Sequence, residues 1–317
     1  MADLITCGAI NWDINLFMPR LPRPGEEVPV NEIQRVSGGT AANVAVASAR
    51  ILGKKRVAFI GALGKDEIGD KQRSILWEEG VDDSGLLFVQ GEESGQAYIS
   101  IGGDGENEIH TYFGANLRLD GMCLRDPERM RLIEGAKVCV IMDPPIETAR
   151  CLAELCKENG VKVIWDPGVY ALKGLDALMP TLANTDYFIL NHLEYENLLG
   201  TDSAHEIARI MHERARGVKC IIKHGAEGCT LTQNSGGAMI HVDAVPLEKL
   251  GMTVVNRVGC GDAFIGGFAS AKVEGLSDED ALRWGNAGGS FKATRKETRG
   301  GPTREQLIEL IERWRSL

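Results

Sequence analysis

Two kinds of apolar pattern alternate along the chain. Six short runs are almost continuously hydrophobic, as strands covered on both faces are: Leu4–Ala9, Val57–Gly61, Lys137–Met142, Val161–Trp165, Tyr187–Leu190 and Cys220–His224. Longer segments place apolar residues at helical spacing: Ala41–Leu52, Asp66–Glu79, Ile146–Glu158, Ser203–Arg216, Ser277–Thr294 and Thr303–Arg315. This alternation predicts an α/β fold with a mostly parallel central sheet flanked by helices, and 317 residues fit one such domain, residues 1–317.

Two regions interrupt the alternation. One runs from about residue 12 to 36 and is rich in Pro and Gly, and the other runs from about residue 86 to 115. Within the second, Tyr98–Ile101 and Ile109–Phe113 flank the turn Gly102–Gly105, a pattern that predicts a β-hairpin.

Near the C-terminus, a glycine turn precedes a carboxylate and a helix. Val254–Val258 is predicted to be a short strand, Gly259–Asp262 a turn, and Ala263–Val273 a helix. Backbone amides in a flexible turn, together with the positive end of a helix dipole, favour an anion such as a phosphoryl group. Two roles are open to Asp262, because an aspartate can cap the helix or accept a proton from a substrate hydroxyl.

Four segments resemble the ribokinase-like (PfkB) family of carbohydrate and nucleoside kinases. Asn256–Asp262 is similar to the family's Asp-Thr-X-Gly-Ala-Gly-Asp signature, and Gly38–Ala45 to its Gly-Gly-X-X-X-Asn-X-Ala motif. Between them, Asn191–Glu194 resembles the Asn-X-X-Glu motif, and Lys223–Gly228 resembles the strand-to-glycine nucleotide segment. The resemblance spans nearly the whole chain and implies a ribokinase-like fold, in which residues 12–36 and 86–115 form a small β lid over the substrate.

The family resemblance also implies an activity. The expected reaction is transfer of the γ-phosphoryl group of a nucleotide, with ATP as the expected donor, to a hydroxyl of a small ribose- or fructose-like sugar. Asp262 would be the general base, and the backbone amides of Gly259, Cys260 and Gly261 would stabilise the migrating group. Cys260 replaces the family's Ala, either as a small spacer or as an acidified, redox-sensitive thiol.

Six residues are implied in substrate binding: Asn11, Asp13, Gly38, Gly39, Asn43 and Asp143. Carboxylates accept paired sugar hydroxyls, glycines let the backbone approach the sugar, and an amide offers both a donor and an acceptor. Structural alternatives are open for each group. Asp13 could be a solvated turn residue, the glycines could simply turn the chain before a helix that carries Asn43, and Asp143 could be a loop residue.

A second set of residues is implied in nucleotide binding: Asn191, Lys223, Gly225, Gly228 and Asn286. Asn191 and Glu194 would organise phosphate-bound Mg²⁺, directly or through waters, and Glu194 is the expected metal residue. Alternatively, Asn191 and Glu194 only cap a helix, and Lys223 extends its ammonium into solvent.

The departure from the family signature at Asn256 and Arg257 bears on cation use. Many relatives bind a potassium ion beside the anion loop through the Asp of Asp-Thr, which Asn256 and Arg257 replace here. We hypothesise that the fixed charge of Arg257 takes the place of this ion, so that potassium would have little effect on the rate. The alternative is that Arg257 points into solvent.

Composition and charge exclude several other classes of protein. The net charge of −10 repels polyanions, so nucleic acid is not an expected partner, and no apolar stretch approaches the length of a membrane span. Eight cysteines without a Cys-X-X-Cys pair favour a reducing, cytoplasmic setting. Lid-mediated dimers occur in relatives, so a homodimer is expected by analogy.

Other functions remain to be weighed against a sugar kinase. A nucleoside kinase shares all of these motifs, and a non-catalytic sugar-binding regulator is a remote alternative because the signature is altered. A dinucleotide-dependent oxidoreductase would need Gly-X-Gly-X-X-Gly after an early strand, and the nearest match ends in Phe264 and lies too late in the chain. The sequence also contains no Gly-X-X-X-X-Gly-Lys-Ser/Thr loop.

Overall fold

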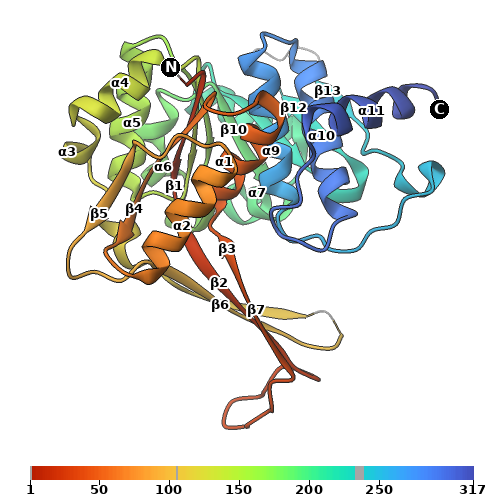
Figure 1. Cartoon of the computed structure of the whole chain (residues 1–317). Helices are drawn as coiled ribbons and strands as arrows, with labels where there is room; N and C mark the ends of the chain where they lie inside the picture. The colour runs from red at the N-terminus through yellow and green to blue at the C-terminus, as the bar shows by residue number, and fades with distance from the viewer. Residues whose placement is uncertain (1, 105, 233–238) are drawn as a thin grey trace.

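The apolar runs assemble into one large sheet in a computed structural model that describes residues 2–104, 106–232 and 239–317 (Figure 1). Within these residues the sheet has nine strands in the order β13-β12-β11-β10-β9-β8-β1-β4-β5. Their bounds are β1 Leu4–Gly8, β4 Val57–Gly64, β5 Leu86–Val89, β8 Val138–Met142, β9 Lys162–Asp166, β10 Tyr187–Asn191, β11 Lys219–Lys223, β12 Cys229–Thr232 and β13 Ile240–Val242. In this spatial order, the seven neighbouring strands β11, β10, β9, β8, β1, β4 and β5 are parallel. Strands β12 and β13 add an antiparallel edge. The mostly parallel sheet expected from the sequence is therefore confirmed.

Helices cover both faces of the sheet. Side chains of α1 Thr40–Leu52, α2 Glu67–Glu78, α9 Cys260–Val273 and α10 Asp278–Ala293 form a buried cluster on one face. The other face is covered by α4 Pro127–Gly135, α5 Ile146–Glu158, α6 Leu175–Leu182, α7 His192–Leu199 and α8 Ala204–Arg214. The C-terminal helix α11 Arg304–Arg315 packs on α10, and the short helix α3 Gly121–Leu124 lies beside α5. Strands buried on both sides explain why their sequences read as continuous apolar runs.

A second, four-stranded sheet extends from the body of the molecule (Figure 1). Its order is β3-β2-β6-β7, with bounds β2 Asn11–Phe17, β3 Glu32–Gly38, β6 Gly95–Ile101 and β7 Asn107–Tyr112. The predicted hairpin is confirmed as the antiparallel pair of β6 and β7, although Gly105 in its turn lies outside the described residues. Leu86–Val89, which we placed in the lid, is instead β5 at the edge of the central sheet, where it pairs with β4.

One predicted strand is absent from the structure. Val254–Val258 has no strand pairing and precedes α9 as irregular chain, with Val254, Val255 and Val258 about half exposed. Three valines in five residues favour a strand by propensity, but among the described residues no strand pairs with this segment to bury them. This segment is instead fixed by a few hydrogen bonds, among them those from the amides of Val255 and Asn256 to the Ala293 carbonyl at 2.7 and 3.1 Å.

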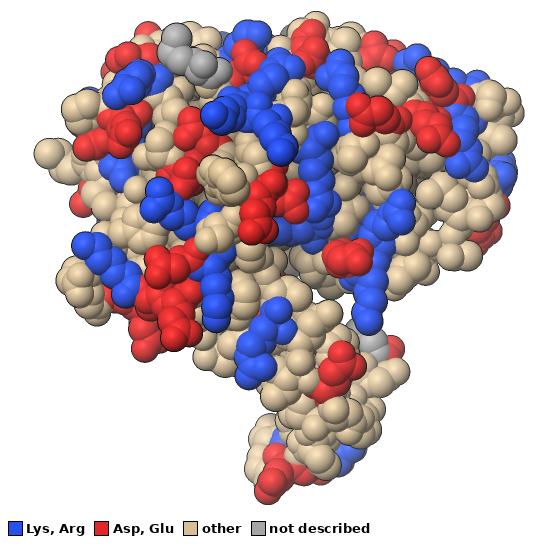
Figure 2. Space-filling view, viewed as in Figure 1, with Lys and Arg blue, Asp and Glu red and all other residues tan. Residues whose placement is uncertain are grey.

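On the face shown in Figure 2, Lys and Arg side chains are interspersed with Asp and Glu, without a broad basic patch. Among the described residues, no helix combines the length and the hydrophobicity that a membrane span needs. All eight cysteines are free thiols.

Candidate active site

The glycine turn before α9 has a backbone that only glycine adopts easily. Gly259 has φ 83° and forms the N-cap of α9, and a Cβ atom there would lie 2.4 Å from the Thr298 carbonyl oxygen. The Cys260 amide donates to the Arg257 carbonyl at 3.2 Å. The amides of Gly261 and Asp262 lie in the first helical turn, where no intrahelical acceptor exists, so these two can face an anion. In this structure Gly261 and Asp262, rather than Cys260, therefore present the available donors.

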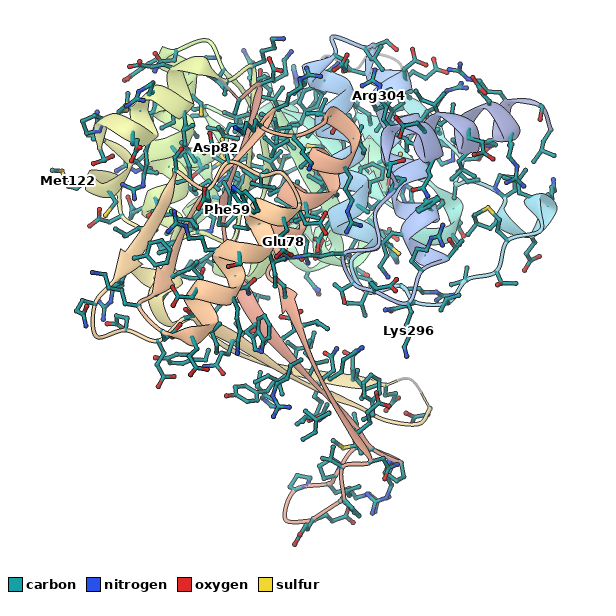
Figure 3. The ribbon with its side chains drawn as sticks, in the orientation of Figure 1. Phe59, Glu78, Asp82, Met122, Lys296 and Arg304 are labelled. Carbon is teal, nitrogen blue, oxygen red and sulfur yellow. The ribbon has the colours of Figure 1, made fainter. Side chains whose placement is uncertain are left out.

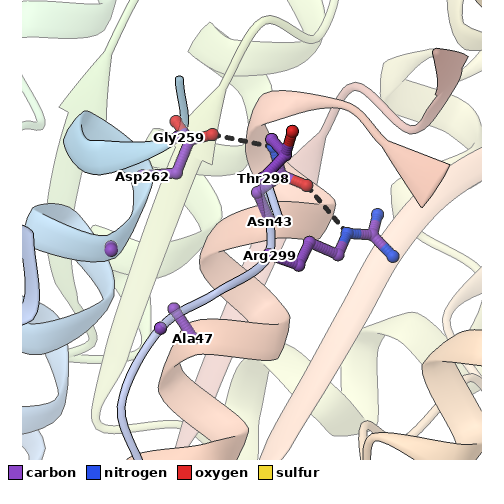
Figure 4. A pocket seen from close by; sticks show the side chains of 8 residues that line it. Asn43, Ala47, Gly259, Asp262, Thr298 and Arg299 are labelled. Carbon is purple, nitrogen blue, oxygen red and sulfur yellow. Dashed lines mark hydrogen bonds between the residues drawn. The ribbon is translucent and has the colours of Figure 1, made fainter. Parts of the chain in front are cut away.

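Asp262 lies one turn into α9 and contacts α1. Its Oδ2 atom accepts a hydrogen bond of 2.8 Å from Nδ2 of Asn43 (Figure 4). The capping role left open by the sequence is wrong, since Gly259 is the N-cap and α9 has no side-chain cap. Burial raises the pKa of Asp262 to about 6, although the Asn43 hydrogen bond and the Lys223 and Arg299 cations oppose this rise. The carboxylate is thus more basic than an exposed aspartate and still ionised at neutral pH.

Arg299 binds the early glycine motif beside Gly259 and Asp262, and sequence reasoning missed it. Its Nε atom donates to Oδ1 of Asn43 at 2.8 Å (Figure 4). Its Nη2 atom donates to the Gly38 carbonyl at 2.9 Å. A void of about 10 Å³, the size of one water, lies between Arg299, Asn43, Asp262 and Gly259. The only signal in the sequence was the glycine pair that follows Arg299 in an irregular segment.

The early diglycine lies against the predicted sugar carboxylate. Asp13 is a buried residue of β2, so the solvated-turn alternative is wrong. A Cβ atom on residue 38 would lie 2.1 Å from Oδ2 of Asp13, which explains a glycine at this position. Burial raises the pKa of Asp13 to about 7, against the attraction of Arg299, and the Asp262 carboxylate raises it further. Asp13, Gly38, Asn43 and Asp262 are therefore brought together.

Two more of the predicted sugar residues, Asn11 and Asp143, are engaged in protein contacts. Oδ1 of Asn11 accepts a hydrogen bond of 3.0 Å from Nδ2 of Asn116. Asp143 follows β8 with φ 55°, and its two oxygens accept hydrogen bonds of 3.0 Å from the Thr40 hydroxyl and from the Val169 amide. Burial, followed by repulsion from Asp166, raises the pKa of Asp143 to about 7.

Lys223 at the end of β11 faces the glycine turn Gly259–Asp262, called the anion turn below, rather than solvent. Its Nζ atom lies 3.3 Å from Oδ2 of Asp166, and its side chain is only 17% exposed, so the solvent-directed alternative is wrong. Burial alone would lower the pKa of Lys223, but the Asp166 and Glu194 carboxylates more than offset burial and raise it. A Cβ atom on Gly261 would lie 3.6 Å from Nζ, which places this ammonium beside the first turn of α9.

Asn191 and Glu194 form a capping box at the start of α7. Oδ1 of Asn191 accepts from the Glu194 amide at 2.9 Å, and the Glu194 carboxylate accepts from the Asn191 amide at 2.7 Å. Burial raises the pKa of Glu194, and the nearby Asp166 carboxylate raises it further. Two neighbouring carboxylates suit Mg²⁺, which uses one or two of them and keeps several waters. Among the described residues, no group of three or more His, Cys, Asp or Glu forms a closed metal cage.

A cavity of about 600 Å³ extends from the anion turn along the edge of the sheet. Four of the five predicted nucleotide residues line it, namely Lys223, Gly225, Gly228 and Asn286, whereas Asn191 does not. Val245, Pro246, Leu247 and Phe264 give it apolar walls, which suit the flat face of a nucleobase. Asn286 donates to the Val242 and Asp243 carbonyls at 2.8 Å and so fixes the wall that follows β13.

Two residues of the altered signature border this cavity. Cys260 lines it, and burial raises the pKa of its thiol, which supports the spacer role over an acidified thiol. Arg257 is exposed and also lines the cavity, so its charge faces the nucleotide side. The cation that contacts the anion turn from behind is a different residue, Lys292, whose Nζ atom donates to the Asn256 carbonyl at 2.9 Å.

Comparison with known proteins identifies the family of the chain and agrees with its fold. Residues 1–305 match the model of the pfkB family carbohydrate kinase. A ribokinase of Haemophilus influenzae is 30% identical over 98% of both chains, and an ATP-dependent ribose-1-phosphate kinase of Halopiger xanaduensis is 28% identical over 98% of both. An Arabidopsis thaliana ribokinase solved with ribose and ATP is 27% identical, with a TM-score of 0.86 over 98% of this chain and 99% of its own. The chain therefore belongs to the pfkB family of carbohydrate kinases, and it is an ATP-dependent sugar kinase.

Proposed function

We propose that this kinase transfers the γ-phosphoryl group of ATP to a hydroxyl of a ribose- or fructose-like sugar, with Asp262 as the general base. One observation carries the proposal: the basic carboxylate of Asp262, in the first turn of α9, binds Asn43 and lies near the Asp13 carboxylate. The Haemophilus influenzae relative is a ribokinase, and the Arabidopsis ribokinase binds ribose and ATP, which favours ribose as acceptor.

The acceptor sugar would bind between the lid and α1. Asp13 and Asn43 offer an acceptor carboxylate and an amide for sugar hydroxyls. Asn11, at the start of β2, and Asp143, just after β8, lie on the same side of the sheet, held by Asn116 and by Thr40 and Val169. Gly38 keeps a side chain out of the space in front of Asp13, and Gly39 lets the chain pass close to the backbone of Ile10. Asp262 would accept the proton of the reacting hydroxyl while its oxygen attacks phosphorus.

The donor would bind along the large cavity, with its phosphates toward the turn. The Gly261 and Asp262 amides and the Lys223 ammonium would receive the charge of the transferring group, because preorganised donors stabilise developing negative charge. Glu194 and Asp166 would hold Mg²⁺ through its waters, and the ion would neutralise the donor phosphates. The base would lie against the apolar wall that contains Val245 and Phe264.

A donor and acceptor panel tests this proposal. Purified protein is assayed for phosphate transfer from ATP and from ADP to ribose, fructose, their monophosphates and a set of nucleosides, in the presence of Mg²⁺. We expect ribose or fructose to be phosphorylated with ATP. Preferential turnover of nucleosides would replace the proposal with a nucleoside kinase, and binding of sugars without any turnover would favour a regulator.

The Asp262→Asn variant tests the role of the base in the same assay. General-base catalysis contributes about 10²–10⁴ in rate, so kcat should fall by that factor while sugar and ATP still bind. The fold should persist, because Asp262 does not cap α9. Near-normal turnover would remove Asp262 from the mechanism.

A further inference from the structure

A fully buried lysine without a carboxylate partner lies behind the anion turn. Lys292, in the last turn of α10, has 0% of its surface exposed. Its Nζ atom donates to the Asn256 carbonyl at 2.9 Å and lies 3.5 Å from the Arg295 carbonyl. Among the described residues it forms no ion pair, in contrast to Lys272, whose ammonium is 2.9 Å from Asp278. Burying an unpaired ammonium is costly, so this arrangement needs an explanation.

The Asn256 and Arg295 carbonyls belong to two segments that meet beside the glycine turn of the active site. The chain before α9 and the chain after α10 are joined by hydrogen bonds from Val255 and Asn256 to the Ala293 carbonyl, and Nδ2 of Asn256 donates to the Lys296 carbonyl at 2.8 Å. Gly259 packs against the Thr298 carbonyl at the same junction. Lys292 therefore holds together the two segments from which the anion turn and Arg299 emerge.

Capping of its own helix does not account for this lysine. A lysine in the last turn commonly donates to the final carbonyls of its own helix. The shorter contact of Lys292 instead reaches Asn256, which lies 36 residues earlier. Burial lowers the pKa of Lys292, whereas Cys260, Glu297 and Asp262 raise it, so the groups that favour its charge lie around the anion turn.

We propose that Lys292 is a built-in cation that positions the anion turn and makes a diffusible monovalent cation unnecessary. Backbone carbonyl oxygens are typical ligands of K⁺. Here the Lys292 ammonium binds the Asn256 carbonyl and lies near the Arg295 carbonyl instead. The neutral side chain of Asn256 fits this arrangement, because its amide donates to Lys296 where a carboxylate could not. The proposal assigns to Lys292 the part that we had expected of Arg257, and it rests on the phosphoryl-transfer role proposed for the turn.

The test compares the wild type with Lys292→Ala and with a matched control, Lys272→Ala. The side chain of Lys272 is also largely covered, at 8% exposed, but its ammonium contacts Asp278 and the Leu276 carbonyl at the other end of α9. Each protein is assayed in K⁺, NH₄⁺ and tetramethylammonium at equal ionic strength, for kcat and for the melting temperature without substrate. Tetramethylammonium is too large to enter a carbonyl site, so it serves as the blank.

We expect wild-type kcat to be unchanged among the three salts. Lys292→Ala should lose up to about 10²-fold in tetramethylammonium, because a misplaced catalytic loop can cost that much, and should regain a large part in K⁺ or NH₄⁺. Its melting temperature should also rise in K⁺, a readout that needs no substrate and so separates this proposal from the choice of sugar. Lys272→Ala should lose stability without any dependence on the salt.

Two results would overturn the proposal. Strong K⁺ activation of the wild type would show that the site still uses a diffusible ion, and this assay needs no variant. A Lys292→Ala protein that loses kcat equally in all three salts, with no K⁺-dependent rise in melting temperature, would reduce Lys292 to a structural residue. A variant too unstable to purify in tetramethylammonium but folded in K⁺ would support the proposal.

Discussion

Three neighbouring side chains lower the pKa of the Asp262 carboxylate and so oppose the effect of its burial. Burial is the largest influence and raises the pKa, while the Asn43 amide, the Lys223 ammonium and the Arg299 guanidinium lower it, which leaves a value of about 6. A base with a pKa just below the working pH is ionised and yet accepts a proton more readily than an ordinary aspartate. Asn43 and Arg299 also touch each other, so they hold the position of the carboxylate as well as its charge.

The pH dependence of the rate should report this tuning. We expect kcat/KM to rise with pH through about 6 and then to level off, because the general base must be deprotonated. Arg299→Gln removes a cation that lowers the pKa of Asp262, so the same rise should move to higher pH. Arg209→Gln, at an exposed position on α8 paired with Glu206, is the control and should leave the profile in place. An unchanged profile in Arg299→Gln would contradict the assigned electrostatic role.

The buried carboxylates should also make the folded state less stable as the pH rises. The folded pKa values of Asp13 and Asp143 are about 7, and that of Asp262 is about 6, against an ordinary value of 3.8. Between these limits the native state binds more protons than the unfolded chain, so its stability falls as pH rises from about 5 to 7.5. The pKa of Asp278 is lowered to about 2, so its contribution to the stability of the fold is lost only below about pH 4. It therefore does not affect the change in stability between about pH 5 and 7.5.

Thermal unfolding at pH 5 and at pH 7.5 measures this effect. The difference in melting temperature should shrink in Asp143→Asn, because an amide does not titrate and asparagine tolerates the positive φ of residue 143. Comparison of the two proteins removes the contribution of all other groups, including His224, whose lowered pKa acts in the opposite direction. An identical pH response of variant and wild type would show that Asp143 does not carry a raised pKa.

At the level of single elements, α1 offers a test of how the diglycine is built. Gly39 and Gly53 flank this helix with nearly the same backbone φ, 91° and 97°, which side chains rarely adopt. A Cβ atom on Gly39 would also lie 2.5 Å from Cα of Ile10, whereas one on Gly53 would meet nothing within 4 Å. Gly53→Ala should therefore cost only the backbone strain, about 1–3 kcal/mol.

Gly39→Ala should cost clearly more than Gly53→Ala, because strain and a backbone collision add. It should also lower kcat/KM, since residue 39 lies between the Gly38 carbonyl, which Arg299 binds, and Asn43. Chemical denaturation measures the first effect, and the sugar kinase assay measures the second. Equal destabilisation of the two variants would mean that the chain can move away from Ile10 at little cost.

Elements with a strong internal pattern were predictable, and elements defined by their neighbours were not. Helix α5 has the bounds expected from its apolar spacing, and β1, β4 and β8 match their predicted runs to within a few residues. Val254–Val258 has the composition of a strand but pairs with no strand among the described residues, so strand propensity alone gave a wrong prediction. Edge strand β13, with three residues, is too short for a pattern and exists because β12 pairs with it.

For the whole molecule, contacts between distant segments decide what the sequence could reveal about the site. The motifs predicted Asp13, Asn43 and Asp262, and the fold brings them together. Arg299 contacts Asn43 across 256 residues, and Lys292 reaches Asn256, but neither lies in a recognisable motif. Figure 3 shows Lys296, from the same segment after α10, extending from the body on the side where the lid lies. The role of that segment follows only from the assembled structure.

The lid presents an apolar outer face that bears on the expected homodimer. Along β2, Asn11, Asp13 and Asn15 are buried toward the body, so the alternating Trp12, Ile14 and Leu16 point outward. The register places Tyr98 beside Ile14 and Ile33 beside Leu16, and these two partners are 41% and 48% exposed. A contiguous exposed apolar surface is typical of an interface.

We therefore expect the protein to have the mass of a dimer in solution, with two lids packed through these outer faces. Tyr98→Glu places a charge in the centre of that face and should give a monomer by light scattering. Met122→Glu adds the same charge to another exposed apolar residue, 78% exposed and far from the lid, and should remain a dimer (Figure 3). A monomeric wild type would contradict the expected dimer. A dimeric Tyr98→Glu variant would place the subunit contact outside the lid. Because β2 carries Asp13 on its inner face, loss of the dimer should also raise KM for the sugar by loosening the strand that holds this carboxylate.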